Sequence, residues 1–244
     1  MRSRFRRQTR HLRFVPQASH VLCILLALSL SSLARDVVDT RQARQKLDAN
    51  PEVLVNAQGL AQQDLSIQGG SYSGSGIALN GLRLKNPWSA HYNAELPIPG
   101  NLLSAPTVGT GLDNISGHLV GTANFNTQPL SSTTQLSTGA GTKEHYTATA
   151  FGSGENAGGY FDWEKARKVD YDANDYERFS GGAFLQFMSD EWMFDLLAAS
   201  QAKEFGAQGY YGAPDTTYAE QQLNDALIFA SATRGELDDA YIQA

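Results

Sequence analysis

Residues 64–81, DLSIQGGSYSGSGIALNG, carry the strongest local signal in the sequence. Two short runs of alternating polar and apolar residues flank a patch of glycine and serine, and the second run ends in Asn80-Gly81. Asn-Gly is the preferred pair for a two-residue type I′ turn, because both of its positions need a positive φ. A tight β-hairpin centred on this pair is therefore predicted.

The register of this hairpin follows from the turn. A two-residue turn at positions 80 and 81 sets Leu79 opposite Leu82 and Ile77 opposite Leu84. All four apolar side chains then fall on one face of residues 77–84, whereas a shift by one residue would divide them between the two faces. Turn chemistry and burial of apolar surface thus predict the same register.

Three elements are expected before this hairpin. Residues 40–56 begin as a short polar helix, which Pro51 ends because proline disfavours helical conformation in the residue before it. Val53 and Val55 then begin a strand. Residues 64–68 alternate, with apolar side chains at positions 65 and 67, and this pattern indicates a second strand with one buried face.

The first 34 residues are typical of a bacterial export signal. The run VLCILLALSLSSL, residues 21–33, would span about 20 Å as a helix and so fall short of a bilayer core of about 30 Å. Small residues at positions 32 and 34 fit a signal peptidase site, and cleavage is expected after Ala34. No acidic residue precedes Asp36, and the basic residues before the run are Arg2, Arg4, Arg6, Arg7, Arg10 and Arg13.

The mature chain is expected to be acidic and free of cysteine. Cleavage removes six of the 19 basic residues, and the remaining 13 against 25 acidic residues give a net charge near −12. Such a charge disfavours nucleic acid as a partner. The single cysteine, Cys23, lies inside the predicted signal, which excludes disulfides and thiolate metal ligands from the mature protein. These features suit a β-rich protein of the bacterial envelope.

From residue 133 onward, segments of about ten residues alternate between polar and apolar and are separated by polar or acidic stretches. Their sequences are TTQLSTGAG, EHYTATAFG, GGYFDWEKA, FSGGAFLQF, WMFDLLAASQ and EQQLNDALIFASAT. A tilted strand of this length spans a bilayer, and aromatic residues near strand ends suit the girdle of an outer-membrane barrel. Those residues are Tyr160, Phe161, Trp163, Phe179, Trp192 and Phe194. Periodicity alone leaves open both a membrane barrel and a soluble sandwich or β-helix with these aromatics in its core.

Several motifs in order resemble one known family. DLSIQGGSYSGSGIALNGLRLKNP, followed by HYNAELPI, resembles the plug domain of TonB-dependent outer-membrane receptors, and VGTANFNTQ (120–128) resembles the segment that closes such plugs. KEFGAQGYYGAP (203–214) resembles an extracellular-loop phrase of some of these receptors. The resemblance implies a mainly β fold: a small α+β plug domain followed by antiparallel strands of an incomplete outer-membrane β-barrel. The implied domains are a signal peptide (1–34), a plug (35–129) and the N-terminal portion of a transmembrane barrel (130–244).

The chain departs from the family pattern at three points. Gln68 stands where an arginine is common, and DVVDT (36–40) is either a weak echo of a TonB box or simply the start of the mature chain. The family barrel has 22 strands, whereas only six or seven are expected here, too few to enclose a plug. Because open strand edges cannot sit unsatisfied in lipid, we expect a truncated fragment comprising a plug and the first barrel strands.

The resemblance implies energy-coupled uptake of a scarce nutrient, such as a siderophore, another metal chelate or cobalamin, across the outer membrane of a Gram-negative bacterium. Its expected partners are a TonB-type energy-coupling protein, the ligand and outer-membrane lipid. Two apical loops, residues 71–76 and 88–93, would face the ligand or serve only plug packing, and these readings remain equally open. The candidate ligand-facing residues are Ser71, Tyr72, Ser73, Trp88, His91, Tyr92 and Asn93.

Neither an enzyme nor a resident cofactor is expected. The nucleophile-elbow, P-loop and zincin motifs do not occur in the sequence, and His91, His118 and His145 lack partners at ligand spacing. The acidic run VDYDANDYE lacks the central glycine of a calcium loop and has no terminal glutamate at the required spacing. No metal site is therefore predicted. Two alternatives stay open: a secreted, non-membrane β-sandwich or adhesin-like binding module, and a non-functional gene remnant.

Overall fold

The computed structural model describes residues 43–58, 60–114, 118–167, 174–189, 191–214 and 218–234. All of them belong to one compact unit, Val37–Ala244. The predicted signal peptide and the weak TonB-box segment, residues 36–40, lie outside the described residues. Within the described ranges, no helix is both long and apolar enough to cross a membrane.

Described residues before position 131, termed the N-terminal region, combine one short helix, four 3₁₀ turns and six strands. All three elements expected before the hairpin form: a helix that ends ahead of Pro51, a strand that starts at Val53 and a second strand, Gln62–Ile67. The elements are α2 (Ala43–Asp48), β1 (Val53–Gln58), β2 (Gln62–Ile67), η1 (Tyr72–Gly74), β3 (Ser75–Leu79), β4 (Leu82–Leu84), η2 (Ala90–Tyr92), η3 (Gly100–Leu102), β5 (Thr107–Thr110), η4 (Gly111–Asp113) and β6 (Gly121–Phe125).

The predicted hairpin forms with the predicted register. Leu79 lies opposite Leu82 and Ile77 opposite Leu84, and Asn80 and Gly81 have φ values of 45° and 73°, as a type I′ turn requires. The expectation of one shared buried face is wrong for Leu82, which is 41% exposed. The reason is the sheet order β4-β3-β6-β5: β3 is central and buried on both faces, whereas β4 is an edge strand.

The centre of this four-stranded sheet is a parallel pair. β3 and β6 run parallel, with Ser75 opposite Gly121 and Leu79 opposite Phe125, whereas β4 and β5 pair antiparallel at the two edges. β1 and β2 form a separate antiparallel hairpin.

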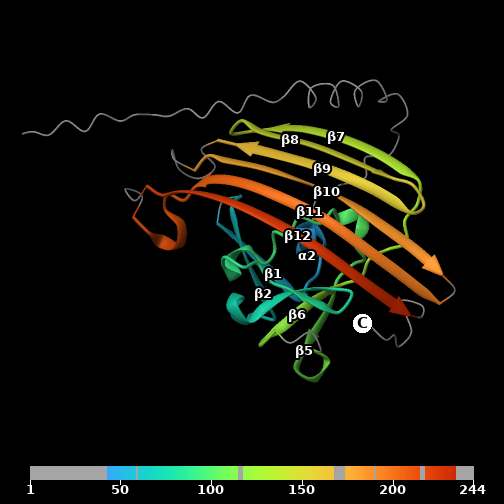
Figure 1. Ribbon diagram of the computed structural model, residues 1–244. Coiled ribbons are helices and arrows are strands. Elements are labelled where there is room, and N and C mark those ends of the chain that lie inside the picture. The colour runs from blue at the N-terminus through green and yellow to red at the C-terminus, as the bar shows by residue number, and fades with distance from the viewer. Residues whose placement is uncertain are drawn as a thin grey trace, which may run out of the picture. The chain divides into compact units, whose positions relative to one another are not determined.

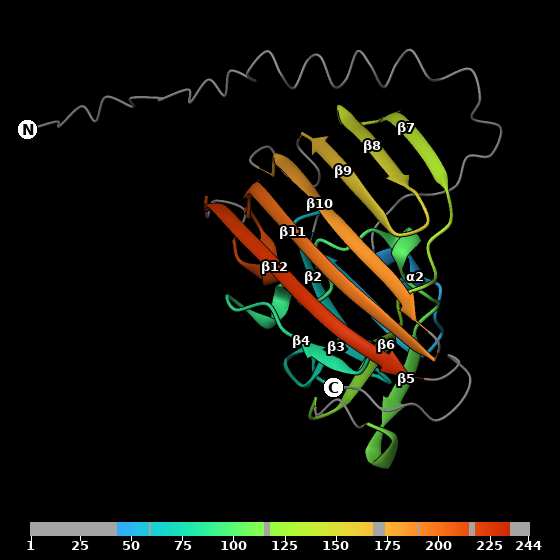
Figure 2. The ribbon, with the colours of Figure 1, turned by 45° about the vertical axis from the view of Figure 1, so that its right-hand side comes forward.

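Six consecutive antiparallel strands form the second sheet, in the order β12-β11-β10-β9-β8-β7. All six segments expected after residue 133 are strands, and the predicted fold class, mainly β with antiparallel sheets, is confirmed. Figures 1 and 2 show the N-terminal region against one face of this sheet. The strands are β7 (Thr133–Gly141), β8 (His145–Ser153), β9 (Ala157–Ala166), β10 (Tyr176–Ser189), β11 (Trp192–Gly206) and β12 (Glu220–Arg234).

The connections between these strands differ in length at the two ends of the sheet. At one end, here called the turn end, β8 and β9 are joined by residues 154–156 and β10 and β11 by residues 190–191. At the other, the loop end, residues 167–175 and 207–219 connect β9 to β10 and β11 to β12, and the shorter connection 142–144 joins β7 to β8. A short tight turn, η5 (Tyr210–Gly212), lies within the last loop.

The two faces of the six-stranded sheet are chemically different. Along β11 the burial pattern alternates strictly, and the buried positions include Asp195, Gln201 and Lys203. The opposite, outer face is exposed and mainly apolar, with polar residues such as Lys165, Glu177 and Glu204 at the loop end. Exposed apolar side chains are normally scattered on a soluble surface. Its large exposed side chains include Phe161, Phe179, Leu185, Phe187, Phe194, Leu196 and Ile228. Tyr160, expected in an aromatic girdle, instead faces inward, and its hydroxyl donates a hydrogen bond to the Pro97 carbonyl.

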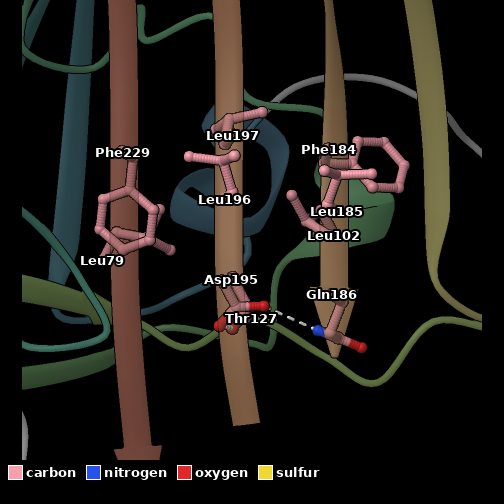
Figure 3. Close-up of a pocket in the computed structure, with 10 residues that line it drawn as sticks. All are labelled: Leu79, Leu102, Thr127, Phe184, Leu185, Gln186, Asp195, Leu196, Leu197 and Phe229. Atoms are coloured by element: carbon pink, nitrogen blue, oxygen red, sulfur yellow. Dashed lines mark hydrogen bonds between the residues drawn. The ribbon is translucent and has the colours of Figure 1, made fainter. Parts of the chain in front are cut away.

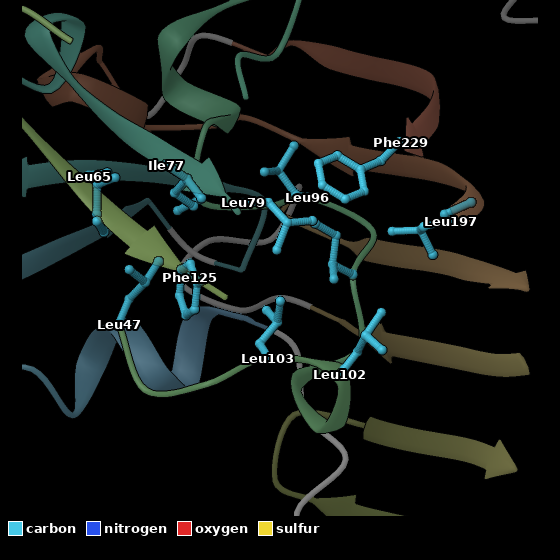
Figure 4. Close-up of a cluster of buried hydrophobic side chains, with 14 of the residues drawn as sticks. Leu47, Leu65, Ile77, Leu79, Leu96, Leu102, Leu103, Phe125, Leu197 and Phe229 are labelled. Atoms are coloured by element: carbon cyan, nitrogen blue, oxygen red, sulfur yellow. The ribbon is translucent and has the colours of Figure 1, made fainter. Parts of the chain in front are cut away.

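One apolar core joins the N-terminal region to the inner face of the six-stranded sheet (Figure 4). Phe125 at the end of β6 is 1% exposed, and Leu197 and Phe229 reach the same cluster from β11 and β12. Burying a side chain of this size contributes about 1.5–3 kcal/mol. The labelled members in Figure 4 are Leu47, Leu65, Ile77, Leu79, Leu96, Leu102, Leu103, Phe125, Leu197 and Phe229.

Candidate functional site

A buried carboxylate near the turn end joins the hairpin to the six-stranded sheet (Figure 3). Asp195 Oδ2 accepts hydrogen bonds from the Asn80 amide at 3.0 Å and from the Thr127 hydroxyl at 2.8 Å. Its other oxygen accepts from the Gln186 amide at 2.8 Å. Asn80 is held in place because its own side-chain oxygen accepts from the Thr127 backbone N–H at 2.8 Å. We call this group, completed by Ser231, the Asp195 contact.

The space beside the Asp195 contact is too small for a ligand. The void lined by Leu79, Leu102, Phe229 and their neighbours measures about 10 Å³, roughly the room that one water needs. The contact between the N-terminal region and the sheet is therefore close-packed here, and a site for a nutrient-sized molecule has to lie elsewhere.

A buried ion pair makes a second contact nearer the loop end. Lys203 on β11 donates to the Glu95 carboxylate and, at 2.6 Å, to the Ala61 carbonyl, and its ammonium lies 4.3 Å from the centroid of the Tyr92 ring. The Lys203 and Glu95 side chains are 1% and 2% exposed. Gln201 on the same strand donates to the Glu95 carbonyl at 3.1 Å. We call this group the Lys203 contact.

Further charges line the inner face of the sheet beside the Lys203 contact. Arg178 on β10 donates to Asp162 at 2.8 Å and lies 3.3 Å from Glu164, and both acidic residues belong to the neighbouring strand β9. Glu164 is also 2.9 Å from His145. The inner face thus presents buried charges of both signs, whereas the outer face is mainly apolar, the reverse of the arrangement in a soluble sandwich.

Two of the seven predicted ligand-facing residues meet at the loop end. Tyr72 in η1 stacks on His91 in η2, with ring centroids 4.4 Å apart and an angle of 22° between the ring planes. His91 Nδ1 lies 2.5 Å from Asp64 Oδ1 and 2.8 Å from the Tyr211 hydroxyl, which is 3.4 Å from the same carboxylate oxygen. We call Asp64, Tyr72, His91 and Tyr211 the loop-end cluster.

The other predicted residues have different surroundings. Ser71 caps η1 by accepting the Ser73 N–H, and both serines are exposed. Trp88 is 64% exposed. Tyr92 and Asn93 are buried: the Tyr92 hydroxyl accepts from Gln62 and donates to Gln221, and Asn93 Oδ1 accepts from a backbone N–H. Burial raises the pKa of the Tyr92 hydroxyl.

Asp64 and Tyr211 were not predicted from the sequence. Asp64 lies within a strand whose alternation suggested only one buried face, yet positions 62 to 65 are all buried. Tyr211 lies between Tyr210 and Gly212 and has a φ of 56°, a conformation that costs a residue with a β-carbon about 1–2 kcal/mol. Burial, followed by the charge of Asp64, raises the pKa of the Tyr211 hydroxyl. The sequence signal at Tyr211 was the phrase FGAQGYYGAP, which predicted a loop but did not indicate which residues Tyr211 contacts.

His118 packs directly on the backbone of β3. A β-carbon at Gly76 would lie 1.9 Å from the His118 ring, so this close approach requires glycine. The imidazole is 8% exposed, and burial lowers its pKa.

We expect the stability of the N-terminal region to fall as the pH drops below about 6.5, where an unfolded histidine takes up a proton. His118 resists protonation when folded, so the unfolded state binds more protons in this range and stability rises with pH. The test is urea unfolding between pH 5 and pH 7.5 for the wild type and for His118→Gln. The variant should show a smaller slope with pH, and equal slopes would contradict the assignment.

Known proteins resemble this chain in structure alone. No protein-family model and no curated protein sequence matches it. Solved structures that do match include FpvA of P. aeruginosa with a heterologous ferric pyoverdine (TM-score 0.58, 13% identity, 80% of this chain and 30% of that chain). The copper transporter OprC matches with a TM-score of 0.56 and 16% identity, over 85% of this chain and 34% of that chain. The FrpB iron transporter of Neisseria meningitidis, as apoprotein, matches with a TM-score of 0.52 and 15% identity, over 82% of this chain and 35% of that chain.

The chain spans about a third of the length of these three solved proteins. Two of them are named as metal transporters, and the other was solved with an iron complex. At such low identities the likeness concerns the fold. The described residues therefore share their fold with part of each of these proteins, including both the N-terminal region and the six-stranded sheet.

Proposed function

We propose that this chain forms the plug and the first barrel strands of a TonB-dependent outer-membrane receptor for a scarce nutrient such as a siderophore or cobalamin. In this proposal residues 1–34 are the export signal, residues 35–129 the plug and residues 130–244 part of the barrel. A TonB-type protein is the energy-coupling partner, through a segment near residues 36–40. The role is transport and not catalysis.

The observation that carries this proposal is the inverted polarity of the six-stranded sheet. Its inner face bears Asp195, Lys203 and Arg178 and packs on the N-terminal region, whereas its outer face carries an exposed apolar band that ends in polar residues at the loop end. An outward apolar band with a polar interior is typical of outer-membrane barrels, as are short turns at one end and longer loops at the other. The fold shared with two metal transporters supports the same assignment.

In this orientation the loop end faces the outside of the cell. Of the seven candidate ligand-facing residues, Ser71, Tyr72, Ser73, Trp88 and His91 are then placed to face the ligand. Tyr72, His91 and the exposed Trp88 supply aromatic and hydrogen-bonding surface, whereas the buried Tyr92 and Asn93 support the loop that carries them.

Neighbouring alanines on β11 allow a matched test, because the predicted mature chain has no cysteine of its own. Ala198 faces outward and Ala199 faces inward. Cysteine variants of the whole protein, made in its native gene, are exposed in intact membranes to a lipid-soluble and to a charged thiol reagent. The Ala198→Cys variant should react only with the lipid-soluble reagent, and the Ala199→Cys variant should react with neither reagent. The Lys143→Cys variant, which places the thiol in a turn at the loop end, should react with the charged reagent.

The receptor assignment would be contradicted if the Ala198→Cys variant reacted with the charged reagent and the protein were recovered in the soluble fraction. That outcome would favour a secreted binding module.

A further inference from the structure

Three side chains from distant parts of the chain converge at the loop end with metal-binding atoms. Asp64 comes from β2, His91 from η2 and Tyr211 from η5. Asp64 Oδ1, His91 Nδ1 and Tyr211 Oη form a triangle with sides of 2.5, 2.8 and 3.4 Å. Metal–oxygen and metal–nitrogen bonds in proteins are about 2.0–2.2 Å long. One ion placed above this triangle can therefore reach all three atoms.

We propose that Asp64, His91 and Tyr211 bind a ferric ion directly. This inference rests on the proposed function, because it deepens the role of the outward-facing loops by naming what they capture. The three donors occupy one face of the ion. Water or the oxygen atoms of a small chelator complete its coordination on the other face, as in three-ligand iron sites that keep open positions.

The donor set selects for this ion. A carboxylate and a phenolate are hard, anionic oxygen donors, and they suit a small, highly charged cation. The imidazole nitrogen disfavours magnesium and calcium, which prefer oxygen ligands alone, and the absence of sulfur among the three donors disfavours copper(I). Binding releases the phenol proton of Tyr211. Among described residues no three His, Cys, Asp or Glu side chains form a metal cluster, and this cluster reaches three donors only with the Tyr211 phenol.

The surroundings hold the donors in place before a metal arrives. Stacking of Tyr72 fixes the plane of the His91 ring, and the Ser89 hydroxyl accepts the His91 backbone N–H at 3.3 Å. Asp64 is largely buried, with 10% of its side chain exposed, whereas Tyr211 is 50% exposed. Tyr211 has a positive φ, and its hydroxyl lies 2.8 Å from His91 Nδ1. Such preorganisation lowers the entropic cost of binding.

The test is a titration of the purified whole protein, in detergent, with ferric nitrilotriacetate. Coordination by a phenolate gives iron(III) a charge-transfer absorption band in the visible range, which neither a carboxylate nor an imidazole produces. We expect this band to saturate near one iron per chain. Tyr211→Phe should abolish it, and Asp64→Asn should weaken iron binding by at least roughly tenfold, the lower end of what even an outer-sphere substitution costs.

A matched substitution serves as the control. Tyr218→Phe removes the hydroxyl of an exposed tyrosine in the same loop and should leave the band unchanged.

A wild-type protein without the band, or a band that survives in Tyr211→Phe, would overturn the ferric site, as would tighter binding of zinc than of iron in competition. These readouts are independent of the cysteine labelling on β11. A correctly inserted protein without the band would thus refute only the metal site.

Discussion

Replacing Lys203 by methionine is expected to lower the free energy of unfolding by about 3–5 kcal/mol, because the Glu95 charge would stay buried without its lysine. Both side chains are almost fully enclosed, and the lysine also donates to the Ala61 carbonyl. The measurement is urea unfolding of the purified whole protein in detergent, followed by the fluorescence of its three tryptophans.

Two further variants make this test specific. Lys165→Met breaks a half-exposed ion pair with Glu177, whose atoms are 2.8 Å apart, and should cost at most about 1 kcal/mol. The double variant Lys203→Met/Glu95→Leu removes both buried charges and should recover most of the lost stability. If Lys203→Met costs no more than Lys165→Met, the Lys203 contact does not stabilise the fold in the way argued.

Replacing Asp195 by alanine is expected to cost about 3 kcal/mol or more, because it removes three hydrogen bonds to one buried carboxylate, and a hydrogen bond to a charged group contributes about 1.5–3 kcal/mol. The Asn80 amide, the Thr127 hydroxyl and the Gln186 amide all donate to this one carboxylate. The same unfolding experiment measures the loss, and hydrogen exchange at residues 77–84 should show faster opening of the hairpin.

The matched control is Glu191→Ala, which removes an exposed carboxylate paired with Arg234 near the turn end. It should change stability by less than about 1 kcal/mol. Asp195 and Lys203 lie eight positions apart on β11, about 26 Å along a strand. The effects of Asp195→Ala and Lys203→Met should therefore add. A loss for Asp195→Ala no larger than for Glu191→Ala would contradict a stabilising Asp195 contact.

Local chemistry allowed much of the fold to be predicted. The Asn80-Gly81 turn fixed the hairpin register because turn type and apolar spacing agreed, and the alternation after residue 133 located all six strands. β10 and β11 nevertheless extend to 14 and 15 residues, beyond the segments of about ten that were expected. Most of the added residues lie at the loop end, among them Lys203 and Glu204, and two lie at the turn end of β10.

The candidate site was only partly predictable because its members are far apart in sequence. Tyr72 and His91 were found through loops that the family resemblance suggested. Their partners Asp64 and Tyr211 are separated by 147 positions, and no local pattern relates them. Tyr160 shows the same limit in the sheet, since an aromatic side chain near a strand end can face either way, and only its contact with Pro97 settles the direction.

The parallel pairing of β3 with β6 dictates an order of events during synthesis. β6, the strand that bridges β3 and β5, is made after both of them. Until residue 125 has left the ribosome or the export channel, β3 has no strand to pair with on the side of β6. Ile77 and Leu79 then remain exposed as unpaired apolar residues. Such long-range closure is slow, and the waiting segment invites aggregation. A chain with this topology needs chaperones to bind it before β6 is available. Its yield in the cell should therefore depend more on the supply of holdase chaperones than on the stability of the folded protein.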